Sequence, residues 1–295
     1  MTRNLSQVAL FASLRAPYDQ GMTPKILAME LMTEPAATDL PERPAEVDPV
    51  VVKVQTLERH GWQPLGQAVL RACYQVATGG SCTLVSDAAT WVVPQGCGVF
   101  IPAGTVQASL TGSGRAVMQT VEIDAQRAAP FGDRCRVMEA TPLLRALVTA
   151  LGGEPADSAR REATTTLLLD EIGRARVSGF ALPDPADPRL RRVARRVWSA
   201  PAEPLDVDGA AALATMSRRT FTRRFGAETG MGFDAWQRRL RLLTAVPRLE
   251  EGVPVSIVAF DLGYDSVSAF IAAFKRAFGE TPKRFGRASV RAAAE

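Results

Sequence analysis

The chain has 295 residues, enough for two hydrophobic cores, and 46% hydrophobic with 22% charged residues is a globular composition. It contains no signal-peptide pattern and no apolar run near the roughly 18–20 residues of a membrane span, so we expect a cytoplasmic protein without a membrane partner. The net charge is only +4, but residues 189–291 hold 19 Lys and Arg against 10 Asp and Glu, whereas residues 1–188 hold 16 against 20. This asymmetry indicates that only the C-terminal part meets a polyanion.

The N-terminal part shows the texture of a β-structure. Residues 1–50 have no clear periodicity, and no structure is predicted for them. From Val50 to Ile123, short apolar runs alternate with turns that contain glycine or proline. Strands separated by turns every 8–12 residues or so indicate a sandwich or a barrel. The expected strands cover residues 51–54, 68–76, 82–85, 91–93, 99–101, 106–110 and 117–123.

The residues available for catalysis are few. The cysteines Cys73, Cys82, Cys97 and Cys135 have no CxxC spacing, and we expect them to be buried, reduced thiols. The single histidine, His60, cannot supply a metal site built from several imidazoles. The chain also lacks a GxxxxGK phosphate-binding loop. The sequence therefore predicts no enzyme, no metal and no cofactor.

Helical periodicity follows the predicted strands. Residues 141–151 and 161–177 each carry an apolar face, which could cover the β-structure or pack against a second subunit; we expect a homodimer. The proline-rich segment 183–188 is predicted to be an extended linker, because prolines at that density disfavour both helix and sheet. We therefore divide the chain into residues 1–130, a helical dimerisation and linker region at 131–182, and a C-terminal domain at 183–295.

The C-terminal domain contains one pattern twice. Each copy has a small residue, a turn, two phenylalanines four residues apart and a glycine, which are the steric requirements of a helix-turn-helix. The first copy consists of Ala211, Thr215, Phe221, Phe225 and Gly230, and the second of Ala259, Gly263, Phe270, Phe274 and Gly279. The copies are offset by 48 residues before the turn and by 49 after it. Two registered copies are much harder to obtain by chance than one.

The expected helices of this domain follow from its caps and periodicity. A basic helix is predicted at 189–198, and Asp206 or Asp208 should cap a short helix through Ala214. Ser217 should cap the next helix. A central helix is predicted at 233–249, which Pro247 should kink or end early. The second copy then gives helices at 256–262 and 266–278.

The C-terminal domain resembles the DNA-binding domain of AraC-type transcriptional regulators. The matching residues are Ser217, Phe225, 228–230, Trp236, Arg239, Arg241 and Leu242 in the first half, and Val255, 257–259, 263–266, 268–270, Phe274, 278–279 and 281–282 in the second. More weakly, residues 93–95 and 100–105 resemble the cupin-like sensor barrel common in this family. The fold class implied is α+β, with an N-terminal cupin-like β-barrel and an all-α C-terminal domain with two helix-turn-helix motifs. Thr215 departs from the family's usual glycine, so its turn should be strained.

The resemblance also places the DNA contacts. An arginine side chain can donate hydrogen bonds to O6 and N7 of one guanine, so the first recognition helix should read bases. The second recognition helix offers mostly small or apolar residues, so it should contribute more to docking on the DNA than to base recognition. Base-contacting positions fall on Arg219, Thr222 and Arg223, beside Arg218, in the first recognition helix, and on Val267, Ser268, Ile271 and Ala272, after Ser266, in the second. Lys275 and Arg276 are candidate phosphate contacts.

An effector site is expected inside the barrel. Leu70, Cys73, Val99, Ile101 and Val117 are the expected inward-facing residues, which favours a mostly apolar or uncharged small molecule. Gln107 stands where the barrel motif usually carries a histidine, so the site should be free of metal. The side chains expected to orient the ligand are His60, Trp62, Gln67 and Gln107.

We therefore predict a sequence-specific regulator that binds double-stranded promoter DNA, responds to a small-molecule effector, and has RNA polymerase as a further candidate partner. Two alternatives stay open. One is a regulator without a ligand, whose barrel serves only dimerisation. The other is a cupin-type enzyme fused to a DNA-binding module. The sequence leaves open whether the regulator is an activator or a repressor.

Overall fold

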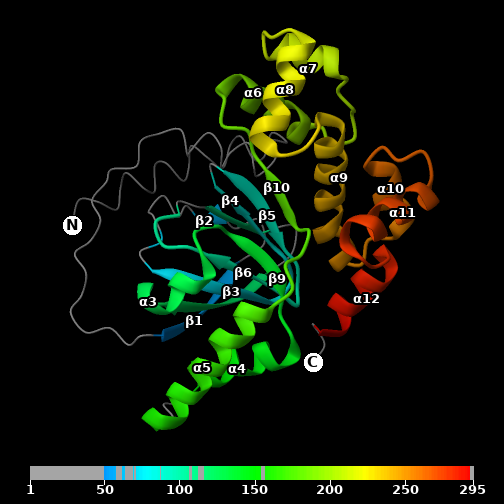
Figure 1. The fold of residues 1–295 in the computed structure, drawn as a ribbon. Helices are drawn as coiled ribbons and strands as arrows, with labels where there is room; N and C mark the ends of the chain where they lie inside the picture. The colour runs from blue at the N-terminus through cyan, green and yellow to red at the C-terminus, as the bar shows by residue number, and fades with distance from the viewer. Residues whose placement is uncertain are drawn as a thin grey trace, which may run out of the picture.

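Two five-stranded antiparallel sheets form the N-terminal part of the chain (Figure 1). The computed structural model describes residues 50–57, 62–63, 69, 71–86, 88–105, 108–111, 116–153 and 157–292. The first sheet has the order β1–β8–β3–β6–β9, and the second has the order β10–β5–β4–β7–β2. The strands are β1 (Val50–Leu57), β2 (Trp62–Gln63), β3 (Ala72–Gly79), β4 (Cys82–Val85), β5 (Ala89–Val93), β6 (Cys97–Ile101), β7 (Ala108–Thr111), β8 (Ala116–Ile123), β9 (Arg136–Glu139) and β10 (Ala181–Pro183).

The side chains of the first sheet divide between two apolar layers, because successive residues of a strand point to opposite faces. Cys73, Val99 and Ile101 are buried in one core with residues of the second sheet, as predicted for inward-facing residues. The prediction for Val117 is wrong. Met118 belongs to this core. Val117, an odd-numbered residue of β8, lies on the same face of the strand as Val121 and Ile123, which belong to the other layer. The fifth predicted inward residue, at position 70, lies outside the described residues.

The other layer is covered by helices. Tyr74, Phe100 and Val121 pack against α4 (Pro142–Gly152) and α5 (Ser158–Arg174), which lie below the first sheet in Figure 1. The short α3 (Ala125–Ala128) precedes them and was not predicted. Of the two roles open to the predicted helices, covering the sheet is confirmed. The second helix begins three residues earlier than predicted and ends at Arg174.

The cysteines form no disulfide. Cys73, Cys82 and Cys97 are buried as predicted, whereas Cys135 is half-buried, and all four thiols are free. Burial raises the pKa of Cys73 and of Cys97 to about 12. These two thiols are therefore uncharged at neutral pH, and they pack as small apolar side chains.

The segment 183–188, predicted to be an extended linker, does not run free between two domains, and the residues just before it are bound to the sheets as well. Val177 bridges Met138 in β9, and β10 pairs with β5 through Ala181 opposite Trp91. Pro183 ends an edge strand, where a missing N–H is tolerated, and Pro188 occupies the first turn of a helix. The prediction failed because it treated the prolines by density and not by position.

The C-terminal part is helical throughout. Its elements are α6 (Pro188–Ser199), α7 (Val207–Leu213), α8 (Arg218–Thr229), α9 (Phe233–Glu250), α10 (Val255–Asp261), α11 (Val267–Phe278) and α12 (Pro282–Ala292), the last of which was not predicted. Asp206 caps α7 and Ser217 caps α8, as predicted. None of the described helices is both long and apolar enough to cross a membrane.

The central helix α9 does not end at Pro247. It continues to Glu250, so the predicted early end is wrong. Pro247 lies within the last turn, where its missing N–H leaves only one helical bond unmade and disturbs no later turn. The carbonyl of Pro247 still accepts a hydrogen bond from the N–H of Glu251, at 3.1 Å, which closes the helix end.

The repeat is confirmed in three dimensions. The pair α7–α8 corresponds to α10–α11 with the predicted offsets of 48 and 49 residues. Gly230 and Gly279 end the recognition helices in the left-handed conformation, with φ of 70° and 85°. The two turns have matching hydrogen bonds: Met216 N donates to Ala211 O at 2.9 Å, and Tyr264 N to Ala259 O at 3.1 Å.

Thr215 is strained, as expected. Its φ is +56°, and no other described residue except glycine has a positive φ. At the equivalent Gly263, with φ +73°, a Cβ atom would lie 2.5 Å from the carbonyl oxygen of Ala202. The second turn therefore requires glycine, whereas the first turn tolerates a side chain at a cost.

We expect Thr215→Gly to raise the free energy of unfolding by about 1 kcal/mol. A β-branched residue in the left-handed region costs about 1–2 kcal/mol, part of which the flexibility of glycine in the unfolded chain offsets. Chemical denaturation measures the change. Gly263→Ala is the reciprocal variant and should be strongly destabilising. A Thr215→Gly protein that is less stable than the original would contradict the strain at this turn.

Candidate nucleic-acid interface

The first recognition helix, α8, presents a basic face to solvent. The Oγ of Ser217 accepts a hydrogen bond from Thr220 N at 3.3 Å and fixes the start of the helix. Phe221 and Phe225, four residues apart, are fully buried. The opposite face therefore points outward, and all four predicted contact residues on this helix are exposed: Arg218, Arg219, Thr222 and Arg223.

The arginines of α8 fall into two electrostatic classes. Arg218 pairs with Asp208 of α7, and Arg224 pairs with Asp187 before α6, at nitrogen–oxygen distances of 2.7 and 3.0 Å. Within the described part of the chain, neither Arg219 nor Arg223 forms an ion pair. No described carboxylate holds these two guanidinium groups, so with respect to that part of the chain their donors are available for the edge of a base.

Sequence reasoning missed the two carboxylates that hold Arg218 and Arg224. Asp208 is ten residues from its partner and Asp187 is thirty-seven residues away, so no local pattern pairs them. Asp187 is recognisable from the sequence only as a helix cap before Pro188. Its side chain is 12% exposed, and hydrogen bonds from Arg189, with Arg224 adding to them, lower the pKa of this carboxyl to about 2.

The second recognition helix, α11, has a different chemical character. The Oγ of Ser266 accepts from Ala269 N at 3.2 Å and caps the helix. Ser266, Ser268, Ala272, Lys275 and Arg276 are exposed. The remaining two predicted contacts, at positions 267 and 271, are half-buried, so only part of each apolar side chain can reach a groove. The positive charges lie in the last turn, where the helix dipole favours them.

Helix α9 separates the two units. It has 18 residues, so it is about 27 Å long at about 1.5 Å per residue. Phe233 and Trp236 near its start pack against Phe225, with ring centroids 5.1 and 5.6 Å apart. Further along, Arg241 lies over the Tyr264 ring of the second unit, 5.4 Å from its centroid. One helix thus carries both units, as a reader of two groove segments requires.

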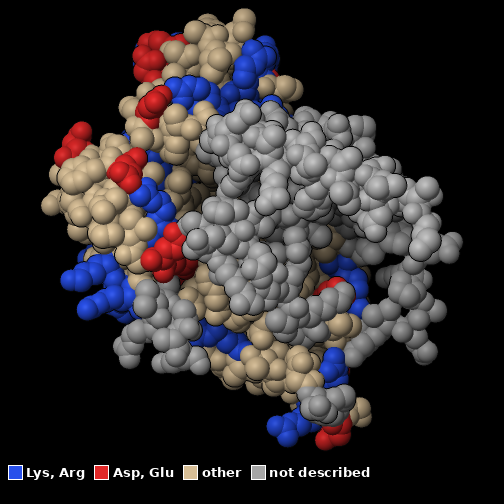
Figure 2. All heavy atoms as spheres, turned by 180° about the vertical axis from the view of Figure 1, so that it is seen from behind, with Lys and Arg blue, Asp and Glu red and all other residues tan. Residues whose placement is uncertain are grey.

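The charge of the surface agrees with this arrangement. Seen from behind, Lys and Arg side chains lie over the upper helices and along the left edge, where the second unit is found (Figure 2). Lys283 and Arg284 of α12 are also exposed. Asp and Glu side chains are interspersed, so the surface is a set of basic positions and not one continuous basic face.

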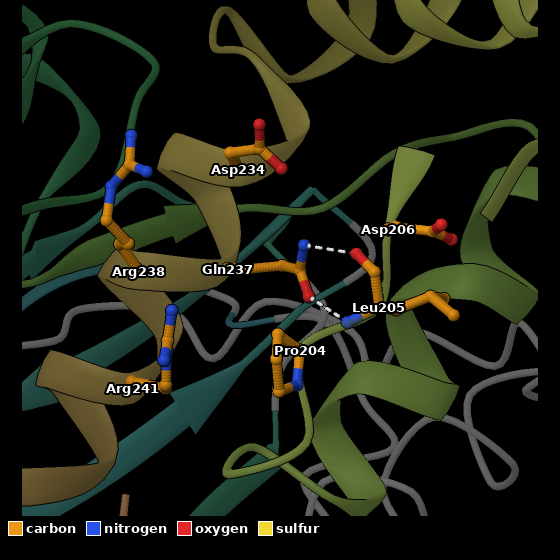
Figure 3. Close-up of a pocket in the computed structure, with 7 residues that line it drawn as sticks. All are labelled: Pro204, Leu205, Asp206, Asp234, Gln237, Arg238 and Arg241. Atoms are coloured by element: carbon orange, nitrogen blue, oxygen red, sulfur yellow. Dashed lines mark hydrogen bonds between the residues drawn. The ribbon is translucent and has the colours of Figure 1, made fainter. Parts of the chain in front are cut away.

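A small open hollow of about 260 Å³ lies between the loop before α7 and α9. Figure 3 shows the Gln237 side chain bonded to the backbone of Leu205: Leu205 N donates to Oε1 at 3.0 Å, and Nε2 donates to Leu205 O at 2.8 Å. The rim carries both signs of charge, with Asp206, Asp234, Arg238 and Arg241. We assign this hollow a structural role, because the side-chain amide of Gln237 at its centre already has hydrogen-bond partners in the Leu205 backbone.

The predicted effector contacts are only partly placed. Trp62 lies in β2, paired with Leu110 of β7. His60, Gln67 and Gln107 lie outside the described residues. Their role in ligand binding therefore stays a prediction.

The C-terminal repeat matches a family model described as a helix-turn-helix domain, over residues 210–288. The chain is 29% identical over 214 residues to the HTH-type transcriptional regulator NimR of Escherichia coli K12, covering 71% of this chain and 77% of that protein. It is 33% identical over 103 residues to the regulator RipA of Corynebacterium glutamicum, covering 35% of this chain and 31% of that protein. The crystal structure of the DNA-binding domain of AdpA in complex with a target DNA is also similar, with 34% sequence identity and a TM-score of 0.34. The match covers 38% of this chain and 98% of the AdpA domain.

We expect Arg223→Ala to weaken binding to a specific duplex by about 1–3 kcal/mol and to relax the base preference at one position, because it removes a free guanidinium fork. Arg276→Ala should weaken binding to all duplexes alike and lower the slope of log affinity against log salt by about 1. Fluorescence anisotropy over a range of salt concentrations measures both effects.

The control for both variants is Arg160→Ala, which removes an exposed arginine from α5 in the N-terminal part. It should leave affinity and salt dependence unchanged. Equal losses for all three variants would show that the effect is one of net charge, and the placement of α8 would then be wrong.

Proposed function

We propose that this chain, a DNA-binding transcriptional regulator of the AraC type, reads promoter DNA mainly through α8 and is controlled by a small molecule held by its N-terminal sheets. The matching domain and the named relatives are those of regulators and not of enzymes. The alternative of a cupin-type enzyme fused to a DNA-binding module is therefore set aside. RNA polymerase is the further partner we propose at the promoter, and the cytoplasm is the proposed location.

One observation carries the DNA-reading part of the proposal. The two recognition helices share one design but differ in their outward side chains: α8 carries the exposed Arg219 and Arg223, which pair with no described carboxylate, and α11 carries small or half-buried residues. We infer that α8 supplies hydrogen-bonded readout, while α11 contributes apolar contacts and, through Lys275 and Arg276, phosphate contacts. Selection of duplexes from a random library by the full chain tests this. The stronger consensus should lie at the half-site that Arg223→Ala relaxes.

The N-terminal part supports an effector site by the composition of its inner layer. Val99, Ile101 and Met118 are apolar and almost fully buried there, and Gln75 is a polar side chain only 8% exposed. We propose that these sheets form a cupin-like sensor that takes a mostly apolar or uncharged ligand, oriented by His60, Trp62, Gln67 and Gln107. An effector acts only if it binds two arrangements of the protein with different affinity.

A second copy of the chain is the proposed partner of α4 and α5. Leu143 and Leu167 on these helices are 46% and 42% exposed, each next in sequence to a buried leucine, Leu144 or Leu168. Single exposed leucines are ordinary, but two on adjacent helices that already cover a sheet are consistent with an isologous interface. We propose the division 1–130 for the sensor, 131–182 for the dimerising helices and 183–295 for the DNA-binding domain.

We expect the full chain to sediment at about 63 kDa at micromolar concentration, twice its 31.7 kDa. The double variant Leu143→Glu/Leu167→Glu should sediment as a monomer, because it places charge on both faces of a symmetric interface. Ile257→Glu makes the same change at a 48% exposed position of α10 and should remain dimeric. A monomer at every concentration for the original chain would rule out the interface.

A thermal-shift screen of uncharged small molecules, followed by duplex binding for every hit, tests the sensor. We expect at least one compound that raises the melting temperature and also changes DNA affinity. A compound that binds the folded protein stabilises it, and if it binds the DNA-bound and DNA-free forms with different affinity, it must change DNA affinity by the same factor. Compounds that stabilise the protein without changing DNA affinity would favour the regulator whose N-terminal part serves only dimerisation.

A further inference from the structure

Residues 176–187, which we call the strap, join both N-terminal sheets to both helix-turn-helix units. At its start, the strap follows the edge of the first sheet: Ser178 N donates to Val137 O at 2.8 Å, and Val177 bridges Met138. It then crosses to the second sheet as β10, where Val92 N donates to Phe180 O at 2.9 Å. The strap therefore spans the side of the sandwich.

The ring of Phe180 enters the core of the second unit. It stacks on Phe278 of α11, with centroids 4.5 Å apart and planes 13° apart, and lies 6.0 Å from the ring of Phe285 in α12. Phe180 is only 6% exposed. The preceding Gly179 leaves no room for a side chain, because a Cβ atom there would lie 2.9 Å from Ala277 O of α11. The backbone of the strap therefore lies directly against the second recognition helix.

The middle of the strap is held by α9. Arg239 donates to Gly179 O at 2.5 Å and to Ala181 O at 2.9 Å, and Trp236 Nε1 donates to Pro183 O at 2.7 Å. These carbonyls belong to alternate residues and point away from β5, so α9 occupies the free edge of the second sheet (Figure 1). The strap cannot slide along α9 without breaking all three hydrogen bonds.

The far end of the strap is tied to the first recognition helix. Glu228 of α8 accepts from Ala186 N and from Asp187 N, at 2.8 and 2.9 Å. Asp187 in turn accepts from Arg224 of α8 at 3.0 Å. Hydrogen bonds from Arg189, with Arg224 adding to them, lower the pKa of Asp187 to about 2, so this carboxylate is charged at neutral pH.

We propose that Phe180 and Asp187 are positioning residues that set the separation of α8 and α11, and hence the spacing of the two half-sites that the protein accepts in DNA. The inference rests on the proposed DNA-binding function. One extended segment contacts α11 through Phe180 and α8 through Asp187, so the fixed length between these two residues defines a distance that α9 alone does not. Because its middle is a strand of the second sheet, a change in that sheet alters this distance.

The test uses the full chain and duplexes that it selects from a random library, each remade with one or two base pairs inserted or removed between the half-sites. Phe180→Leu keeps apolar bulk but loses the stacking, and Asp187→Asn keeps a helix cap but loses the charge. We expect each to lower the preference for the selected spacing by about two- to tenfold, in keeping with the worth of one aromatic pair or one charged hydrogen bond. Arg224→Gln should match Asp187→Asn, and the double variant should add nothing more.

Two control variants make the same chemical changes away from the strap. Phe131→Leu removes an 8% exposed phenylalanine that lies 5.3 Å from the Phe100 ring, and Asp157→Asn alters the cap of α5. Both should keep the spacing preference of the original chain. A uniform loss of affinity at every spacing, or equal shifts in strap and control variants, would overturn the positioning role. Failure of the original chain to select any duplex would instead overturn the proposed function.

Discussion

An edge strand exposes a row of backbone groups that must find partners, and β10 is such a strand. Its pairing with β5 satisfies one side only. On the other side the carbonyls of Gly179, Ala181 and Pro183 accept from Arg239 and Trp236. Arg239 is partly buried, and desolvation lowers its pKa; its Nε and Nη2 atoms donate to the carbonyls of Ala181 and Gly179, which offsets part of the cost of burying the charge. The central helix of the DNA-binding domain therefore supplies the hydrogen-bond donors that the outer edge of β10 needs.

This arrangement has a consequence for the core. The buried residues between the sheets, those of the strap and the aromatic cores of both helix-turn-helix units form one connected cluster. Phe180 and Leu182 are the buried strap residues in this cluster, and the half-buried Ala181 packs against it. A protein whose two halves share a core cannot move one half without disturbing the other, because packed interiors deform poorly. The fold thus links the N-terminal sheets physically to both helix-turn-helix units.

Much of the helical domain was predictable from the sequence, because its signals are local. Ser217 and Asp206 are helix caps, and Phe221 and Phe225 lie one turn apart. Because the pattern occurs twice, the helices assigned in one copy can be compared with those in the other. The strap was not predictable. Its strand has three residues and ends in proline, and its hydrogen-bond partners in α9 lie 53 to 60 residues away in the sequence. Strand β9 was missed for a similar reason, since Arg136–Glu139 has charged ends and only Val137 and Met138 are buried.

The central proposal is that α8 and α11 enter successive major-groove segments on one face of the DNA. The most direct test is to methylate guanine N7 in a selected duplex with and without the full chain and to compare which guanines are protected. Two protected clusters about 10 base pairs apart are predicted, because N7 lies in the major groove and one helical turn separates the segments. Protection should be stronger in the cluster that Arg223→Ala abolishes. A single protected cluster, or two clusters half a turn out of phase, would contradict the account.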